Sequence, residues 1–256
     1  MTYVKSANRV MEILQVVSNY PHGLTLSEIC DQLNMPKSST HEILHSMAQT
    51  KFLQLDGKKY RMGIKVFELG QTVSRNLDLL HAIRPHLKWV STQSGMTAQF
   101  AILDVTEIVY LSKIKNNNGI TVESEVGGRL PAHVTALGKA MLSLVSDEEI
   151  KQRFSQLVFK QYSKNSIASY DELRRRLIEI RENEYAEDIE EFTKGVYCLA
   201  VPVPGIRTET LGAISLSMPE TLRNQVDRPV MLGNLREAGK KIIEDIRYFY
   251  GSKSLT

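Results

Sequence analysis

The sequence has few of the features that mark secreted or membrane proteins. Its 256 residues include two cysteines, Cys30 and Cys198, which lie far apart and suggest no disulfide framework. The longest apolar runs are short and interrupted by charged residues, so no segment is predicted to span a bilayer. The first residues lack an apolar stretch with a cleavage site, so no secretory signal is predicted. We therefore expect a cytoplasmic protein that does not interact with a membrane.

The chain also lacks a strong net charge of either sign. Its 32 lysines and arginines against 29 acidic residues give a net charge of +3. This mildly basic balance permits a nucleic-acid partner but does not by itself indicate one. With 42% hydrophobic residues, the composition is that of a globular protein, and the length fits one large domain or two smaller ones.

Near its start, the sequence contains three consecutive amphipathic helical patterns. Apolar residues recur at i, i+3, i+4 and i+7 in each pattern, and Thr25 with Glu28 forms a capping box that opens the second. The three stripes are Val10, Ile13, Leu14 and Val17; Leu26, Ile29, Cys30 and Leu33; and Thr40, Ile43, Leu44 and Met47. Short helices with single stripes can bury them only against one another. Because only a short turn, Asn34-Met35-Pro36, separates the last two, we predict a helix-turn-helix.

A β-hairpin is predicted directly after the third helix. Residues 52–55 and 58–62 flank Asp56-Gly57, which we predict to be a two-residue loop. A basic hairpin at this place is interpreted as a wing that contacts DNA phosphates. The wing residues in that role are Lys58, Lys59 and Arg61. Residues 1–63 hold seven lysines and arginines against five acids, so we expect DNA affinity to depend on two or more copies per site.

The third helical pattern supports two different functions. Its outward face carries hydroxyl and imidazole groups suited to phosphates and base edges. The residues predicted to face DNA are Lys37, Ser38, Ser39, His41, Glu42 and His45. However, His41-Glu42-x-x-His45 also matches the zinc signature of metallopeptidases, so a zinc hydrolase with Glu42 as its base is the alternative. Since no third ligand is recognisable nearby and the hairpin follows at once, we favour DNA binding and predict no catalytic residue, metal or cofactor.

Residues 64–95 are predicted to form a helical connector. The pattern indicates a helix over 64–84, and Leu69-Gly70 is a candidate interruption. Pro85 is expected to end or kink this helix near Arg84, because proline lacks the backbone N–H group that a helix needs. The apolar stripe of this segment is a candidate dimer contact, although packing on its own domain is equally well supported.

Beyond residue 96, strands alternate with helices, which predicts an α+β sensor-like domain. Strands are expected over 99–103, 108–112, 120–124, 198–203 and 211–217, and helices over 136–144 and 227–250. Ser146 with Glu149 and Ser169 with Glu172 are capping boxes that open two further helices.

Within this second domain, Ser215 and Ser217 are predicted to share one face of a strand. Their hydroxyls need partners if the face is buried, and a solvent-facing strand is equally well supported. By default, Cys198 is a small core residue and Asp188 is a surface carboxylate. No nucleophile–base pair at a recognisable spacing supports an enzyme in this region.

Several ordered motifs extend over essentially the whole chain. They are residues 4–14, 33–40 and 60–63 in the first part, and residues 130–140 and 184–191, with Gly195 and 198–200, in the second. With these motifs at these separations, the chain resembles the IclR family of bacterial transcriptional regulators. It departs from the family at Glu42, where an arginine is usual, and at Glu184, where glycine is usual. The first departure is expected to change the operator preference.

The resemblance implies an α+β fold with two domains. A winged helix-turn-helix is expected over residues 1–66, a linker helix used in dimerisation over 67–88, and a GAF-like α/β effector-binding domain over 89–256. The implied function is that of a ligand-responsive regulator, which we interpret as a repressor of a catabolic operon. Its expected partners are double-stranded operator DNA, a small organic acid as effector, and further copies of itself in a homodimer or homotetramer.

The resemblance also implies an effector pocket. Carried over by motif position, its residues are Ala136, Leu137, Asp188, Cys198, Ser215 and Ser217. Serine hydroxyls and the backbone N–H groups of a helix start suit a carboxylate ligand. Because Asp188 would repel a bare carboxylate, it favours a ligand that bears a hydroxyl or is partly neutralised.

Overall fold

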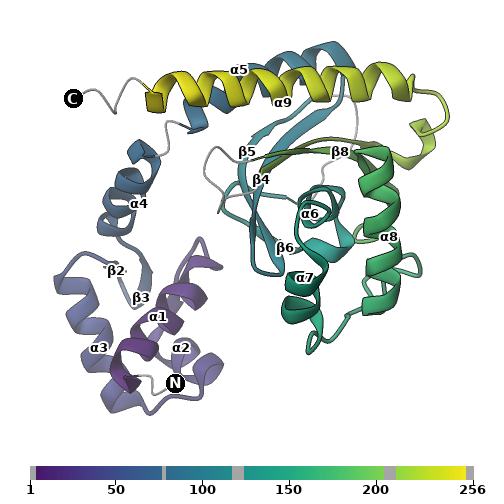
Figure 1. The fold of residues 1–256 in the computed structure, drawn as a ribbon. Helices are drawn as coiled ribbons and strands as arrows, with labels where there is room; N and C mark the ends of the chain where they lie inside the picture. The colour runs from purple at the N-terminus through teal and green to yellow at the C-terminus, as the bar shows by residue number, and fades with distance from the viewer. Residues whose placement is uncertain (1–3, 77–78, 117–123, 205–211, 252–256) are drawn as a thin grey trace. The chain divides into compact units, whose positions relative to one another are not determined.

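The chain forms two compact units, Met1–Leu77 and Asp78–Thr256. They are drawn in Figure 1 from a computed structural model, which describes residues 4–76, 79–116, 124–204 and 212–251. Within these ranges, no helix is both long enough and apolar enough to cross a membrane. The predicted strand over 120–124 and the turn at Gly205 fall largely outside the described residues.

The first unit is built on the three predicted helices, α1 (Lys5–Ser18), α2 (Leu26–Leu33) and α3 (Lys37–Gln49). Their apolar stripes meet in one core, whose most buried members include Ile13, Val17, Ile29, Leu44 and Met47. Both hydrogen bonds of the capping box between Thr25 and Glu28 are present at the start of α2. The helix-turn-helix follows directly from the spacing of these apolar residues, since each stripe has only the other two to pack against.

The wing is a small antiparallel sheet in the order β1-β3-β2, formed by β1 (Leu24–Thr25), β2 (Leu53–Asp56) and β3 (Lys59–Met62). Asp56 pairs with Lys59 across the hairpin, so the loop is Gly57-Lys58 and the prediction of an Asp56-Gly57 loop was wrong by one residue. Gly57 has a φ of 61°, a left-handed conformation that glycine adopts without strain. Placing the glycine first in the loop leaves Asp56 within the ladder.

The connector consists of two helices, α4 (Ile64–Asn76) and α5 (Leu79–Ser94). Gly70 lies inside α4, so the candidate interruption at Leu69-Gly70 does not occur. Pro85 lies inside α5, so the helix does not end near Arg84, which was one of the two predicted effects of this proline; a kink was the other. The apolar side chains of α5 on both sides of the proline are completely buried, namely Ala82, Ile83, Leu87 and Val90. We infer that this packing outweighs the one backbone hydrogen bond that proline removes.

The second unit contains a six-stranded antiparallel sheet in the order β6-β5-β4-β9-β8-β7. Its strands are β4 (Thr97–Asp104), β5 (Glu107–Ile114), β6 (Arg129–Pro131), β7 (Ala186–Ile189), β8 (Val196–Val203) and β9 (Gly212–Pro219). The predicted hairpin is β4–β5, and the two predicted late strands are β8 and β9. The short strands β6 and β7 at the sheet edges were not predicted. The sheet joins β4 to β9, which lie more than a hundred residues apart in the chain.

Helices cover both faces of this sheet (Figure 1). On one face, α5 and the long α9 (Arg228–Gly251) pack against β4, β8 and β9. On the other face lie α6 (Ala136–Leu142), α7 (Asp147–Phe154) and α8 (Tyr170–Asn183). Ser146 and Ser169 cap α7 and α8 as predicted, since each hydroxyl accepts a hydrogen bond from the backbone N–H of the glutamate three residues later. The resulting layers confirm the predicted α+β fold of this unit.

Glu184, which follows α8, is one of the two positions where the sequence departs from the motifs of the family that it resembles. Glu184 ends the helix in a left-handed conformation, with a φ of 59°. A residue with a Cβ is strained in this region, whereas glycine is not, which accounts for the usual glycine at this position. The backbone shape of the turn is therefore kept in this chain, at a conformational cost.

The start of α6 packs very closely against the preceding turn (residues 132–134). A Cβ atom added to Gly138 would lie 2.2 Å from the backbone oxygen of Ala132 and 2.4 Å from its Cα atom. Both neighbours are backbone atoms that cannot move independently of the chain. Gly138 is therefore required for the position of α6.

We predict that Gly138→Ala lowers the free energy of unfolding of the second unit by roughly 1–3 kcal/mol, because the methyl group forces α6 away from residue 132. Gly233→Ala is the matched control, since Gly233 lies exposed in α9 with no atom within 4 Å of its added Cβ. This control should be neutral or stabilising by up to about 1 kcal/mol. Urea unfolding followed by circular dichroism measures both, and equal stability of the two variants would contradict the assignment.

Candidate DNA-binding face and effector pocket

The outward face of α3 is polar and accessible. Lys37, Ser38, His41, Glu42 and His45 are exposed, while Ser39 is half-buried. The inward residues Thr40, Leu44 and Met47 are buried in the helical core. The side chains predicted to face DNA thus lie together on one surface of the first unit.

The two histidines of the H-E-x-x-H pattern stack on this surface. The rings of His41 and His45 are nearly parallel, with 6.5 Å between their centroids. The side-chain nitrogen of Gln49 lies 3.0 Å from Nε2 of His45. Within the described part of the chain, no group of three or more His, Cys, Asp or Glu residues is placed to hold a metal ion. Both histidines are exposed on the outward face of α3.

The three basic residues of the wing differ in their surroundings. Lys58 and Lys59 are exposed, and Arg61 forms an ion pair with Asp56 over 3.0 Å. Both members of this ion pair are solvent-exposed, so the pair contributes little to the stability of the fold. Another anion can therefore replace Asp56 as the partner of Arg61.

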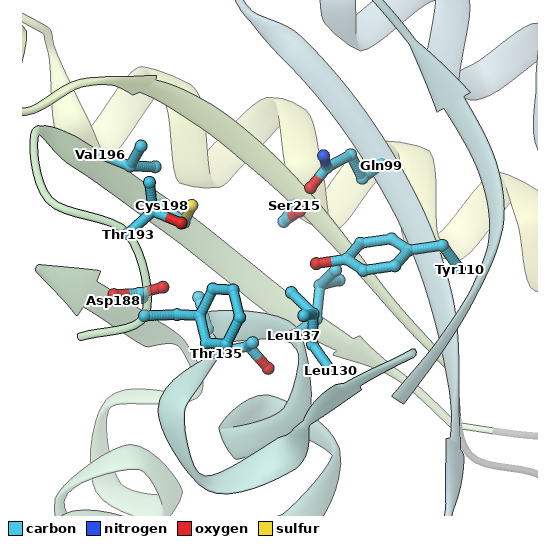
Figure 2. Close-up of a pocket in the computed structure, with 12 residues that line it drawn as sticks. Gln99, Tyr110, Leu130, Thr135, Leu137, Asp188, Thr193, Val196, Cys198 and Ser215 are labelled. Carbon is cyan, nitrogen blue, oxygen red and sulfur yellow. The ribbon is translucent and has the colours of Figure 1, made fainter. Parts of the chain in front are cut away.

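The second unit contains a cavity between the sheet and the start of α6. It opens to solvent, and its lining residues come from all six strands of the sheet, from the start of α6 and from the segment after β7. Five of the six predicted effector-binding residues line it, namely Ala136, Leu137, Asp188, Cys198 and Ser215. Figure 2 shows their side chains together with those of Gln99, Tyr110 and Thr135, which also line the cavity.

The two predicted serines have different environments. Ser215 is 1% exposed, and its Oγ atom has no hydrogen-bond partner in the described structure. Ser217 does not line the cavity; its hydroxyl donates to Oε1 of Gln99 over 3.3 Å and lies 3.1 Å from Sγ of Cys198. Since a buried hydroxyl without a partner is destabilising, Ser215 is the serine that a ligand would satisfy.

Tyr110 is a cavity residue that the sequence did not reveal. It comes from β5, its ring is buried, and its hydroxyl points into the cavity (Figure 2). Burial raises the pKa of Tyr110, so its hydroxyl remains protonated and can donate a hydrogen bond. Gln99 was not predicted as a cavity residue either. It lies directly opposite Ser215 in the ladder between β4 and β9. The pairing of these distant strands was the missing information.

Asp188 is buried, with 5% of its surface exposed, so its default interpretation as a surface carboxylate was wrong. The backbone N–H of Glu191 donates a hydrogen bond of 2.8 Å to its Oδ1 atom. Burial raises the pKa of Asp188 to about 7, and the nearby ammonium of Lys139 limits this rise. The carboxyl group therefore changes its charge near neutral pH.

The start of α6 forms another wall of the cavity. The hydroxyl of Thr135 accepts a hydrogen bond of 3.0 Å from the backbone N–H of Gly138 and thereby caps the helix. Ala136 and Leu137 are the first residues of the helix, where backbone N–H groups have no carbonyl partner within the helix. Both residues line the cavity.

Comparison with known proteins identifies the family to which both units belong. The model of the IclR helix-turn-helix domain matches residues 6–57, and that of the bacterial transcriptional regulator IclR C-terminal domain matches residues 71–244. The chain belongs to the IclR family. It is therefore a helix-turn-helix transcriptional regulator, and the metallohydrolase alternative has no support among its relatives.

Individual IclR-family proteins match nearly the whole chain. The regulator XynR of Escherichia coli K12 is 30% identical over 93% of both chains. The regulator KdgR of Dickeya chrysanthemi is 30% identical over 96% of this chain and 81% of its own. An IclR homolog from Microbacterium hydrocarbonoxydans, solved in complex with 4-hydroxybenzoate, has the same fold, with a TM-score of 0.84 and 23% identity over 95% of this chain and 99% of its own.

The buried Asp188 predicts an unusual dependence of stability on pH. Its folded-state pKa of about 7 lies above the ordinary value of 3.8, so its contribution to stability is fully present below about pH 4 and is lost as pH rises to about 7. Asp188→Asn removes this loss and keeps the Oδ1 acceptor. We expect the variant to gain stability over the wild type as pH rises from 4 to 7, and the gain to stay constant above 7. Thermal unfolding at several pH values measures this, and a gain that does not change with pH would contradict it.

Proposed function

We propose that this IclR-family regulator binds a small organic acid in the cavity of its second unit and thereby changes its binding to double-stranded operator DNA. In this proposal the protein is a cytoplasmic repressor of a catabolic operon and acts as a homodimer or homotetramer. The observation that carries the proposal is the buried hydroxyl of Ser215, which lines the cavity and has no hydrogen-bond partner among the described residues. A ligand that forms a hydrogen bond with such a buried hydroxyl would supply the partner that the protein does not provide.

The chemistry of the cavity walls supports an organic acid. The hydroxyls of Ser215 and Tyr110 and the free N–H groups at Ala136 and Leu137 are all hydrogen-bond donors suited to a carboxylate. Asp188 contributes its Oδ2 atom, which has no hydrogen bond with any described residue. Cys198 contributes a soft, weakly polar surface, and Ser217 acts through its hydrogen bond to Gln99. The complex of the Microbacterium homolog supports this choice, because 4-hydroxybenzoate carries both a carboxylate and a hydroxyl.

The polar face of α3 and the wing are proposed to contact DNA. Hydroxyl, imidazole and lysine groups would bind phosphates and base edges, and the Glu42 carboxylate would accept a hydrogen bond from cytosine. The proposed DNA-binding residues are Lys37, Ser38, Ser39, His41, Glu42, His45, Lys58, Lys59 and Arg61. Exposed apolar side chains on α4, namely Ile64, Phe67 and Leu69, support the proposal that the linker over residues 67–88 contributes to a dimer contact.

The DNA-binding proposal is tested by a combined variant with Ser38, Ser39, Lys58 and Lys59 replaced by alanine. We expect operator affinity to fall at least tenfold and the slope of log affinity against log salt to decrease by about 2, one for each lysine removed from a phosphate. Effector binding should be unchanged. Lys151→Ala with Lys194→Ala removes two exposed lysines of the second unit as a control. Unchanged affinity and salt slope in the combined variant would refute the assigned face.

The effector proposal is tested with the full-length chain in a thermal-shift screen of small organic acids that includes 4-hydroxybenzoate. An acid that binds the cavity raises Tm, and calorimetry then gives its affinity. Ser215→Ala should weaken binding roughly tenfold or more, because a hydrogen bond to a charged group contributes about 1.5–3 kcal/mol. Ser217→Ala should have a smaller effect, since that hydroxyl has partners within the protein.

The control for these variants is Ser143→Ala, because the hydroxyl of Ser143 is buried and donates to the backbone oxygen of Ala140, away from the cavity. It tests whether loss of any buried hydroxyl disturbs the unit. Equal affinity in Ser215→Ala and the wild type would show that the ligand binds elsewhere.

A further inference from the structure

A buried cluster of charged side chains lies behind the cavity wall. Lys139 of α6 is completely buried, and its ammonium forms an ion pair with the carboxylate of Glu191, which is 8% exposed. Glu191 follows β7 and donates its backbone N–H to Asp188. The cluster thus contains two carboxyl groups and one ammonium within a region shielded from water.

The charges of this cluster do not balance when both carboxyl groups are ionised. Lys139 neutralises Glu191 through direct contact, and no ion-pair partner of Asp188 lies among the described residues. An ionised Asp188 therefore leaves a net charge of −1 at the cavity wall, whereas a protonated Asp188 leaves none. Bringing an anion into a low-dielectric site beside an uncompensated negative charge is strongly unfavourable.

The other titratable groups around the cluster do not supply the missing positive charge. Burial raises the pKa of Tyr110 on β5 and of Cys198 on β8, so both stay neutral near pH 7. Burial lowers the pKa of His133, which precedes α6, to about 4, so it is neutral as well. Burial also raises the pKa of Glu191, and the contact with Lys139 opposes this rise. From α8, Arg176 and Glu172 act on Glu191 with opposite signs.

One oxygen of Asp188 remains available to a ligand. Its Oδ1 atom accepts the hydrogen bond from Glu191, whereas Oδ2 has no hydrogen bond with any described residue. Asp188 also lines the cavity. A proton on Oδ2 would turn this oxygen from an acceptor, which repels a carboxylate, into a donor, which binds one.

We propose that the cavity binds an organic monoanion together with one proton, that Asp188 carries this proton on Oδ2, and that effector affinity therefore falls as pH rises. This inference rests on the proposed function, namely that the effector is an organic acid. In the binding step, one proton from solvent bonds to the ionised Asp188 carboxylate, and the resulting O–H donates to the carboxylate of the ligand. The Lys139–Glu191 pair stays neutral and makes Asp188 the site of proton uptake.

The proposal predicts a specific pH profile. Below about pH 7, Asp188 is already protonated in the empty cavity, so affinity should not change with pH. Above this value, each pH unit should weaken binding about tenfold, since one proton must be taken up for each ligand. Calorimetric titration of the full-length protein at pH 8, in phosphate and in Tris, measures that uptake from the different ionisation enthalpies of the two buffers. We expect close to one proton per bound ligand.

The probes are 4-hydroxybenzoate, benzoate, lactate and pyruvate, each titrated at pH 6 and pH 8. The decisive variant is Asp188→Asn, whose amide imitates the protonated acid. It should take up no proton, bind equally well at both pH values, and bind about tenfold more tightly than the wild type at pH 8. Asp171→Asn, an exposed aspartate at the start of α8, is the matched control and should behave like the wild type.

The outcomes separate this inference from the proposed function. An acid that binds the wild type with equal affinity at pH 6 and pH 8, without proton uptake, would overturn the proton-coupled proposal and leave the organic-acid effector intact. Failure of every acid to bind at pH 6, where the cluster is neutral, would overturn both. Weaker binding by Asp188→Asn than by the wild type at pH 8 would show that the ionised carboxylate itself contacts the ligand.

Discussion

The structure of the second unit depends on the burial of one ammonium group. Lys139 has no contact with solvent, so its charge must be matched inside the protein, and Glu191 matches it. This ion pair joins α6 to the segment after β7, and both of these elements supply cavity walls. The neighbouring Gly138 lets α6 approach the turn before it closely enough for Lys139 to enter the interior. The adjacent glycine and lysine of the family motif therefore have separate physical roles in fixing one cavity.

The cavity wall contains polar groups that are not satisfied by the described residues of the protein. Among the described residues, no group forms a hydrogen bond with the hydroxyl of Ser215, and burial disfavours the charged form of Asp188. Both features make the ligand-free unit less stable than its packing alone would allow. An effector that satisfies these groups recovers that free energy on binding, and a regulator requires such a difference between its free and bound states. The same features that lower stability therefore provide the driving force for sensing in our proposal.

The sequence predicted the first unit more completely than the second, because its structure follows from local patterns. The spacing of apolar residues determines α1, α2 and α3. The wing loop was misplaced by one residue, and the short strand β1 was not predicted. In the second unit, the packing of the buried side chains on both sides of Pro85 keeps α5 helical. No local sequence pattern predicts that packing. Tyr110 and Gln99 were missed because their position depends on pairing between β4 and β9, which lie far apart in the chain. For the same reason, the sequence did not distinguish Ser215 from Ser217, which share one face of β9. Only Ser215 lines the cavity.

The charges on the first unit suggest why an effector can control its DNA binding in the proposed mechanism. Arg61 of the wing is paired with Asp56, and Glu42 adds a carboxylate to the exposed face of α3. Each copy therefore attracts the phosphate backbone weakly, and stable binding would require two or more copies acting together. The affinity of such an assembly is sensitive to how its copies are arranged. An effector that stabilises one arrangement by only a few kcal/mol can then release the operator, so weak attraction per copy is an advantage in a switch.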